Sequence, residues 1–98
     1  MGMKPYTVSD TEIRAWKISP RFPFPNWSES GRETFRGYTR INTYFVDSSG
    51  FGSDSEPALT VEAFVNKLRP GCSYAIVGVG QFQVYIAEFS QITTRRGC

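Results

Sequence analysis

The sequence predicts a small α+β domain, in which one or two short helices pack on one face of a three- or four-stranded, mostly antiparallel sheet. A chain of 98 residues has the length of one domain, so we predict a single globular domain over residues 1–98. Hydrophobic residues make up 40% of the chain and aromatic residues 15%, which suffices for one modest core. Segments of helical and strand character alternate in the order α-β-α-β-β.

The first predicted helix covers residues 8–17. Ser9 and Glu12 have the spacing of a capping box, and Pro20 prevents the helix from continuing. The competing interpretation is a strand, one side of which would carry Arg14, Trp16 and Ile18. The capping pattern favours the helix.

Residues 20–27 contain three prolines, which favour an extended path rather than a regular element. The same segment carries three aromatic side chains, Phe22, Phe24 and Trp27. They either cover the core or form an exposed arm that contacts a partner or a second subunit.

The strand predicted over residues 34–46 has two different faces, because successive side chains of a strand point to opposite sides. One face collects side chains that can pack on a core, namely Phe35, Gly37, Thr39, Ile41, Thr43 and Phe45. The other face collects cations, an amide and phenols, namely Arg36, Tyr38, Arg40, Asn42 and Tyr44. We expect this second row to face water or a polar, anionic partner. A bend or bulge is expected at Gly37.

A polar loop over residues 47–57 precedes the second predicted helix. Thr60 is the expected cap, and Pro70 followed by Gly71 ends the helix. An apolar stripe at helical spacing is formed by Val61, Phe64, Val65 and Leu68. This stripe predicts that the helix packs on the sheet.

The C-terminal part is rich in β-branched and aromatic residues from Tyr74 to Ile92, which is too long for one strand. Gly78 and Gly80 divide it, so strands are predicted at about 73–78 and 82–91. Residues 93–98 are expected to be a frayed tail.

One local resemblance to a known family is present in residues 67–81, Lys-Leu-Arg-Pro-Gly-Cys-Ser-Tyr-Ala-Ile-Val-Gly-Val-Gly-Gln. This passage resembles the helix-then-strand passage of OB-fold single-stranded-DNA-binding proteins, in which a basic residue and a glycine precede an apolar strand that ends in glycine. The resemblance does not extend to the N-terminal third. It implies single-stranded nucleic acid as one candidate ligand.

Several kinds of catalytic and metal site are excluded by composition. The chain has no histidine, which removes Ser-His-Asp and Cys-His nucleophilic sites and every zinc site that uses histidine. No phosphate-binding Gly-rich loop with its lysine is present, and we expect no cofactor and no metal. If Glu88 faces inward, between Ile86 and Ser90, burial would raise its pKa, whereas at the rim of the sheet it would pair with an Arg or Lys side chain. A small-ligand pocket or a hydrolase that uses this carboxylate is the third functional hypothesis.

The net charge of +2 is too small to indicate nucleic-acid binding by itself, but it is unevenly distributed. Residues 1–40 carry seven Lys or Arg against four Asp or Glu, and residues 41–66 carry four acids and no cation. Residues 67–98 carry four cations against one acid. This distribution predicts a basic face opposite an acidic one.

Cys72 and Cys98 are expected to be free thiols, the first half-buried and the second at a mobile end, which favours a reducing cytoplasm. No apolar run approaches the ~18 residues that a membrane span needs, and residues 1–6 lack the apolar part of a secretory signal. We therefore expect a cytoplasmic protein with no membrane partner.

The residue types on the polar row predict a binding module without enzymatic activity, which acts through a protein partner or through self-association as a homodimer. The residues predicted to contact the partner are Arg36, Tyr38, Arg40, Tyr44, Trp27, Phe22 and Phe24. The alternative is that the same face binds single-stranded nucleic acid, with cations on phosphates and rings stacked on bases. Ordinary cross-strand packing of Arg and Tyr would also explain the row.

Overall fold

The computed structural model describes residues 4–20, 34–47, 58–80, 83–91 and 98. Within these ranges the order of elements is β1 (Tyr6–Thr7), α1 (Asp10–Ile18), β2 (Tyr38–Asp47), α2 (Val61–Val65), β3 (Ser73–Val79) and β4 (Gln83–Gln91). The predicted α+β fold with a small sheet and two short helices is confirmed. Among the described elements, the sequence pattern did not predict β1, which is two residues long, and it began the strand β2 at residue 34, whereas β2 starts at Tyr38.

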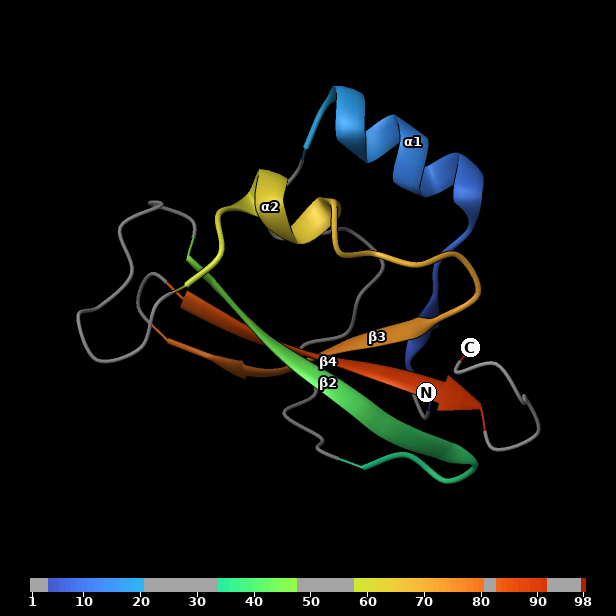
Figure 1. Cartoon of the computed structure of the whole chain (residues 1–98). Helices are drawn as coiled ribbons and strands as arrows, with labels where there is room; N and C mark the ends of the chain where they lie inside the picture. Colours follow the sequence, from blue (N-terminus) through green and yellow to red (C-terminus); the bar gives the residue numbers. More distant parts are fainter. Residues whose placement is uncertain (1–3, 21–33, 48–57, 81–82, 92–97) are drawn as a thin grey trace.

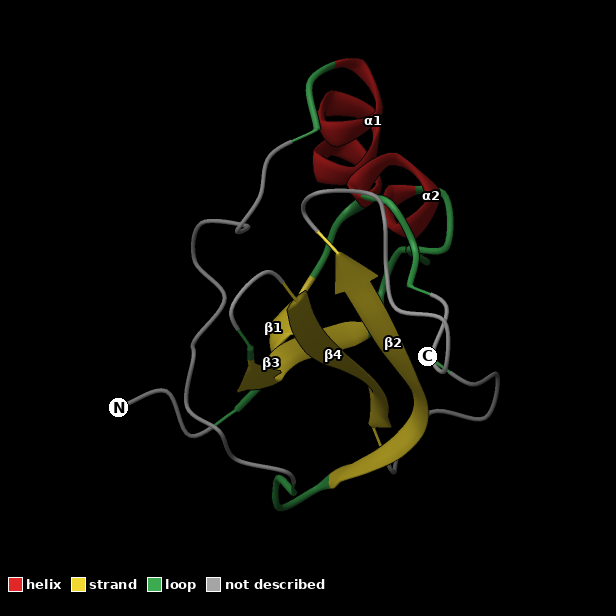
Figure 2. Cartoon of the chain, turned by 90° about the vertical axis from the view of Figure 1, so that its left-hand side faces the viewer, coloured by secondary structure: helices red, strands yellow, loops and turns green. Residues whose placement is uncertain are grey.

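The molecule has two layers, with both helices on one face of the sheet (Figures 1 and 2). The strands follow the spatial order β1-β3-β4-β2, and every neighbouring pair is antiparallel. In the described sheet, β3 and β4 are therefore the two inner strands, and β1 and β2 are the edge strands. We call the side that carries the helices the helix face, and the opposite side the far face.

Helix α1 begins where the capping box predicts. The Ser9 hydroxyl accepts a hydrogen bond from the Glu12 backbone N–H at 3.2 Å, and the Glu12 carboxylate accepts one from the Ser9 backbone N–H at 3.0 Å. Ile13 and Trp16 are the buried residues of the helix and face the sheet. The helix is thus confirmed over the competing strand interpretation, and Ile18 is its last residue.

Helix α2 is shorter than the apolar stripe suggested. Thr60 caps it by accepting a hydrogen bond from the Ala63 N–H at 3.0 Å, and Phe64 and Val65 are its buried residues. Leu68 is buried in the turn that follows the helix. The chain then reverses at Gly71, whose φ of 87° suits glycine. Backbone hydrogen bonds join this turn to Val8, which ties α2 to the start of α1.

Strand β2 contains a bulge that the sequence pattern did not predict. In the register with β4, Arg40 lies opposite Phe89 and Asn42 lies opposite Glu88, so Ile41 is an extra residue. Gly37, where a bend was expected, has a φ of 87° and lies in a turn closed by the Tyr38 N–H on the Phe35 carbonyl at 3.1 Å. The bulge changes which side chains share a face, because a one-residue shift moves every later side chain to the other side.

Two hydrophobic clusters lie on the two faces of the sheet. The main core is on the helix face and consists of Val8, Ile13, Trp16, Val46, Phe64, Val65, Leu68, Cys72, Tyr74, Ile76, Val84 and Ile86. The far-face cluster consists of Phe35, Ala75, Ala87 and Phe89. The rings of Phe35 and Phe89 meet edge to face, with centroids 5.2 Å apart.

Cys72 and Cys98 form a disulfide, with Cα atoms 4.7 Å apart, so the expectation of two free thiols is wrong. The spacing of 26 residues gave no sign of the pairing, because it depends on where the chain end lies in space. The bond fixes Cys98 against the turn before β3. The argument for a cytoplasmic location from free thiols does not hold for this pair.

Three predicted segments fall largely outside the described part of the chain. They are the aromatic and proline segment 20–27, of which Pro20 alone is described, the polar loop 47–57, of which Asp47 alone is described, and the tail 93–98, of which Cys98 alone is described. Among the described helices, none is both long enough and apolar enough to cross a membrane.

Candidate functional site

The most distinctive site is a buried carboxylate on the inner strand β4. Glu88 lies opposite Tyr74 of β3 on one side and opposite Asn42 of β2 on the other. Antiparallel pairing places directly opposed residues on the same face, so these three side chains form one row across the sheet. The row is on the helix face, and the side chain of Glu88 is 0% exposed.

Four neighbouring side chains donate hydrogen bonds to this carboxylate. Oε1 accepts from Asn42 Nδ2 at 2.9 Å, from the Tyr44 hydroxyl at 3.2 Å and from the Arg69 guanidinium at 3.2 Å. Oε2 accepts from the Tyr74 hydroxyl. That hydroxyl accepts in turn from the backbone N–H of Arg69 at 3.0 Å. We call these five residues the Glu88 cluster.

The protonation states of the cluster follow from these contacts. Burial raises the pKa of Glu88, but the hydrogen bonds from Tyr74, Asn42 and Arg69 outweigh it and hold the pKa below its usual range. Burial also raises the pKa of Tyr74, and the bond to Glu88 raises it further. Tyr44 behaves similarly, because burial and the Glu88 charge both raise its pKa. The raised pKa expected for an inward-facing Glu88 is wrong in direction, because the carboxylate is hydrogen-bonded and paired with Arg69.

The arrangement suits a structural anchor better than an acid catalyst. A carboxylate with a depressed pKa stays ionised at neutral pH and has no proton to donate. Both of its oxygens are already engaged, and it has no exposed surface. Arg69, whose side chain is 50% exposed, belongs to the connection between α2 and β3. The cluster therefore fastens that connection to the centre of the sheet.

The predicted Arg/Tyr row does not lie on one open face, and this expectation is wrong. Tyr38 packs against the far-face cluster, and the Arg40 guanidinium lies 5.8 Å from the centre of the Phe89 ring on the same side. After the bulge the alternation is reversed. Tyr44 lies on the helix face, where its ring meets that of Phe64 at 5.5 Å. Asn42 joins Tyr44 there, on Glu88.

The reversed alternation after the bulge also moves side chains that were predicted to pack on the core. Phe45 lies on the far face, where its ring meets the ring of Tyr85 at 4.6 Å. Val46 takes the core position instead and is completely buried. Arg36 lies exposed in the turn before β2. Of the predicted partner-binding residues in β2, Tyr38 and Arg40 therefore lie on the far face, and Tyr44 lies on the helix face.

The outer edge of β2 is the longest exposed strand edge in the described sheet. Its C-terminal end is covered, because the Leu59 N–H donates to the Phe45 carbonyl at 2.8 Å and the Asp47 N–H donates to the Leu59 carbonyl at 2.9 Å. Towards its N-terminal end the strand is open to solvent, with Thr39, Arg40, Asn42 and Thr43 all exposed. The Arg40 side chain donates a hydrogen bond to the Thr43 hydroxyl at 3.3 Å.

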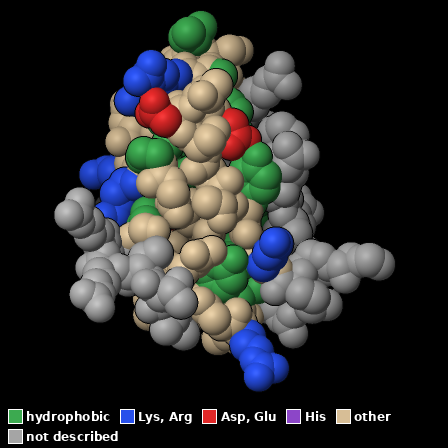
Figure 3. All heavy atoms as spheres, turned by 90° about the vertical axis from the view of Figure 1, so that its right-hand side faces the viewer, with side chains coloured by type: hydrophobic (Ala, Val, Ile, Leu, Met, Phe, Trp, Pro, Cys, Tyr) green, Lys and Arg blue, Asp and Glu red, His purple; other side chains and the backbone are tan. Residues whose placement is uncertain are grey.

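Positive and negative side chains are intermixed on the face of the molecule that Figure 3 presents. Figure 3 shows cationic side chains spread over the face that it presents, with acidic side chains among them. In the part of the chain that the structure describes, no group of three or more His, Cys, Asp or Glu side chains could hold a metal ion. Phe22, Phe24 and Trp27, the remaining predicted contact residues, lie outside the described ranges.

Two members of the Glu88 cluster, Tyr74 and Arg69, were missed by sequence reasoning. Alternation with Ile86 did indicate that Glu88 points inward, and a buried acid needs donors and a cation. The identity of those partners depends on the pairing of β3 with β4, which no local pattern gives. Comparison with known proteins adds no further candidate, since no family model, no curated protein and no solved structure matches the chain.

Proposed function

We propose that this domain is a non-enzymatic binding module that associates with another polypeptide, in the first instance a second copy of itself, along the outer edge of β2. The observation that carries the proposal is the position of this strand. It is ten residues long, it lies at an edge of the described sheet, and its N-terminal half is exposed. An edge of this kind can pair with an added strand.

The backbone geometry supports strand addition at a particular residue. The Phe45 carbonyl and the Asp47 N–H point outward, since both are bonded to Leu59. Backbone groups of an antiparallel strand point to the same side at every second residue. Thr43, two residues before Phe45, therefore directs its N–H and carbonyl towards the outer edge, where a partner strand would pair.

The side chains around this edge suit a selective contact. An added strand would meet Arg40 on the far face and Asn42 on the helix face, on either side of the bulge. A bulge and a charged residue are features that limit indiscriminate edge-to-edge pairing. Arg and Tyr are enriched in interface residues with large binding energies. The expected partner is therefore one strand in one register.

The state of Glu88 argues against its use as a general acid in hydrolysis. Its oxygens accept hydrogen bonds inside the fold, and its pKa is shifted downward, which is opposite to the shift that a general acid needs. This weakens the third hypothesis of the sequence analysis.

A proline at Thr43 tests the proposal. Thr43→Pro removes the outward N–H without removing a hydrogen bond to β4, and proline is tolerated at such edge positions. Thr43→Ala is the matched control, because it removes the same hydroxyl and keeps the N–H. We expect wild type and Thr43→Ala to show a concentration-dependent dimer by sedimentation, and Thr43→Pro to remain a monomer with an unchanged circular dichroism spectrum.

Two outcomes would contradict self-association on this edge. One is a wild-type protein that stays monomeric up to about 1 mM. That result would mean that the free energy of dimerisation is weaker than about −4 kcal/mol. The other is a Thr43→Pro protein that still forms the dimer as well as Thr43→Ala does.

Single-stranded nucleic acid is the second candidate, because Tyr38 and Arg40 share the far face and Arg36 is exposed just before them. Binding of a fluorescent oligonucleotide should then fall steeply between low and high salt, as phosphate contacts do. The double variant Arg36→Ala, Arg40→Ala should abolish it while the protein stays folded. Binding that does not change with salt would count against this candidate.

A further inference from the structure

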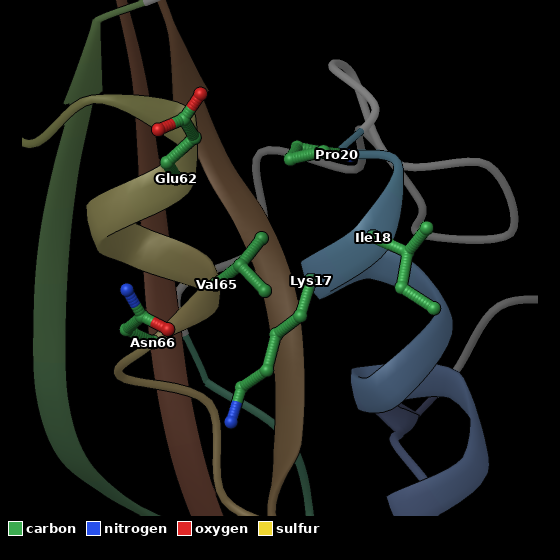
Figure 4. Close-up of a pocket in the computed structure, with 6 residues that line it drawn as sticks. All are labelled: Lys17, Ile18, Pro20, Glu62, Val65 and Asn66. Atoms are coloured by element: carbon green, nitrogen blue, oxygen red, sulfur yellow. The ribbon is translucent and has the colours of Figure 1, made fainter.

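A pocket of about 330 Å³ lies between the C-terminal end of α1 and helix α2. The described residues that line it are Lys17, Ile18, Pro20, Glu62, Val65 and Asn66 (Figure 4). None of them belongs to the Glu88 cluster or to the β2 edge. The volume is at the lower end of the range of small-molecule sites.

Three polar side chains of different chemistry face this pocket. Lys17 offers an ammonium group, Glu62 a carboxylate and Asn66 an amide. Among the described residues, none of these three side chains makes a hydrogen bond or an ion pair, whereas Arg14 pairs with Asp10. A cation and an anion that border one pocket without neutralising each other within the chain are free to bind a ligand that carries both charges.

The apolar part of the lining separates the charged groups. Val65 is 1% exposed and forms the buried wall, while Ile18 is 87% exposed beside the pocket. Glu62 lies in α2 and Asn66 is the residue that caps its C-terminal end, so the two are about one helical turn, or about 6 Å, apart along the axis. Figure 4 shows Glu62 at one end of the pocket, and the Lys17 ammonium and Asn66 towards the other, with Val65 between them.

We propose that this pocket binds a small zwitterion whose ammonium and carboxylate groups are separated by a short apolar chain, as in an ω-amino acid. The carboxylate accepts hydrogen bonds from Lys17 and Asn66, both of which carry donors. The ammonium group pairs with Glu62, and the methylene chain covers Val65. A ligand with only one of the two charges leaves Lys17 or Glu62 without its partner. This site is independent of the proposed β2 interface.

The test is a titration of isotope-labelled full-length protein, followed by amide chemical shifts. The probes are 4-aminobutanoate, glycine as the short zwitterion, and butanoate and butylamine as ligands with one charge. We expect saturable shifts at Lys17, Val65 and Asn66 with 4-aminobutanoate, with a Kd of about 1 mM. Glycine and the singly charged ligands should bind at least about tenfold more weakly, since each loses one charge-assisted contact or the spacing.

Variants of the two charged residues complete the test. Lys17→Gln and Glu62→Gln each keep side-chain length and remove a charge, and each should weaken 4-aminobutanoate by about tenfold. Lys67→Gln is the control, because Lys67 is exposed and adjacent to Asn66 in sequence but does not line the pocket. It should bind like the wild type. All three positions are exposed, so the variants are expected to fold, which thermal melts will verify.

Three results would overturn the inference. The first is the absence of saturable shifts at the pocket up to about 100 mM ligand. The second is that butanoate or butylamine binds as tightly as 4-aminobutanoate, which would show that the site does not bind both charged groups of one ligand. The third is unchanged binding in both Lys17→Gln and Glu62→Gln.

Discussion

The two faces of the sheet are built from the same strands but bury different numbers and kinds of side chains. On the helix face, twelve of the described residues are buried in the main core, and they include the large rings of Trp16, Phe64 and Tyr74. On the far face, four of the described residues are buried in the second cluster, and two of them are alanines. The fully buried carboxylate of Glu88 lies on the helix face, where Tyr74, Asn42 and Arg69 can surround it. The comparison illustrates that a buried charge needs close hydrogen-bonding and charged partners, which Glu88 has on the helix face.

The largest expected effect comes from truncating one ring on each face. Phe64→Ala should destabilise the protein by about 4 kcal/mol, because Phe64 is completely buried and contacts the rings of Tyr44 and Tyr74. Phe89→Ala should cost less, about 3 kcal/mol, because Phe89 lies in the smaller cluster, where its ring meets one other ring, that of Phe35. Chemical denaturation measures both. Equal losses would mean that the far-face cluster is as important a core as the main one.

The disulfide should make the next largest contribution to the free energy of unfolding. One of its two cysteines, Cys72, lies in the main core on the helix face. Cys98→Ser should destabilise the oxidised protein by about 3 kcal/mol, because the bond closes a loop between residues 26 positions apart. Serine at position 98 is preferable to serine at position 72, since Cys72 is completely buried. Under reducing conditions the wild type and the variant should have the same Tm. A difference that persists under reduction would assign the loss to packing.

Removal of the Glu88 charge should cost about 2 kcal/mol at neutral pH, since several charge-assisted hydrogen bonds weaken together in Glu88→Gln. The loss should depend on pH. The pKa of Glu88 is lower in the folded protein than its ordinary value of 4.5, so its contribution to stability is present above about pH 4.5 and is lost as pH falls below it. The stabilities of wild type and variant should therefore converge in acid. Parallel curves from pH 7 down to pH 2 would contradict this account.

At high pH, the stability of the protein should depend on Tyr74. Its pKa is raised above the ordinary value of 10.0, so the unfolded chain ionises first and the wild type should lose stability as pH rises above about 10. Tyr74→Phe is the matched variant, because it keeps the ring that packs in the main core. It should show a smaller loss above that pH.

The smallest effect is expected on the far face. Arg40→Ala should change stability by less than about 1 kcal/mol, because Arg40 is exposed and its contact with Phe89 is a cation–π interaction at the surface. Asn42→Ala, on the other side of the bulge, should cost more, since its amide donates to the buried Glu88. Thermal unfolding of the two variants compares them. A larger loss in Arg40→Ala would mean that the bulge does not separate the two faces in solution.

Local patterns were sufficient where the interactions are local. The capping box of α1, the cap and apolar stripe of α2, the turns at Gly37 and Gly71, and the separation of the last two strands all depend on residues a few positions apart. Short-range sterics and hydrogen bonds fix these features, so the sequence alone predicted the α+β class and nearly all of its elements.

The tertiary structure decided which side chains meet. The bulge at Ile41 depends on how β2 pairs with β4, and it placed Tyr44 on the core and Phe45 on the far face, against the simple alternation. The pairing of β3 with β4 placed Tyr74 beside Glu88, and the chain path brought Cys98 to Cys72. Contacts of this kind join residues that are distant in sequence, and their register is set by the packing of whole strands, which no local residue pattern contains.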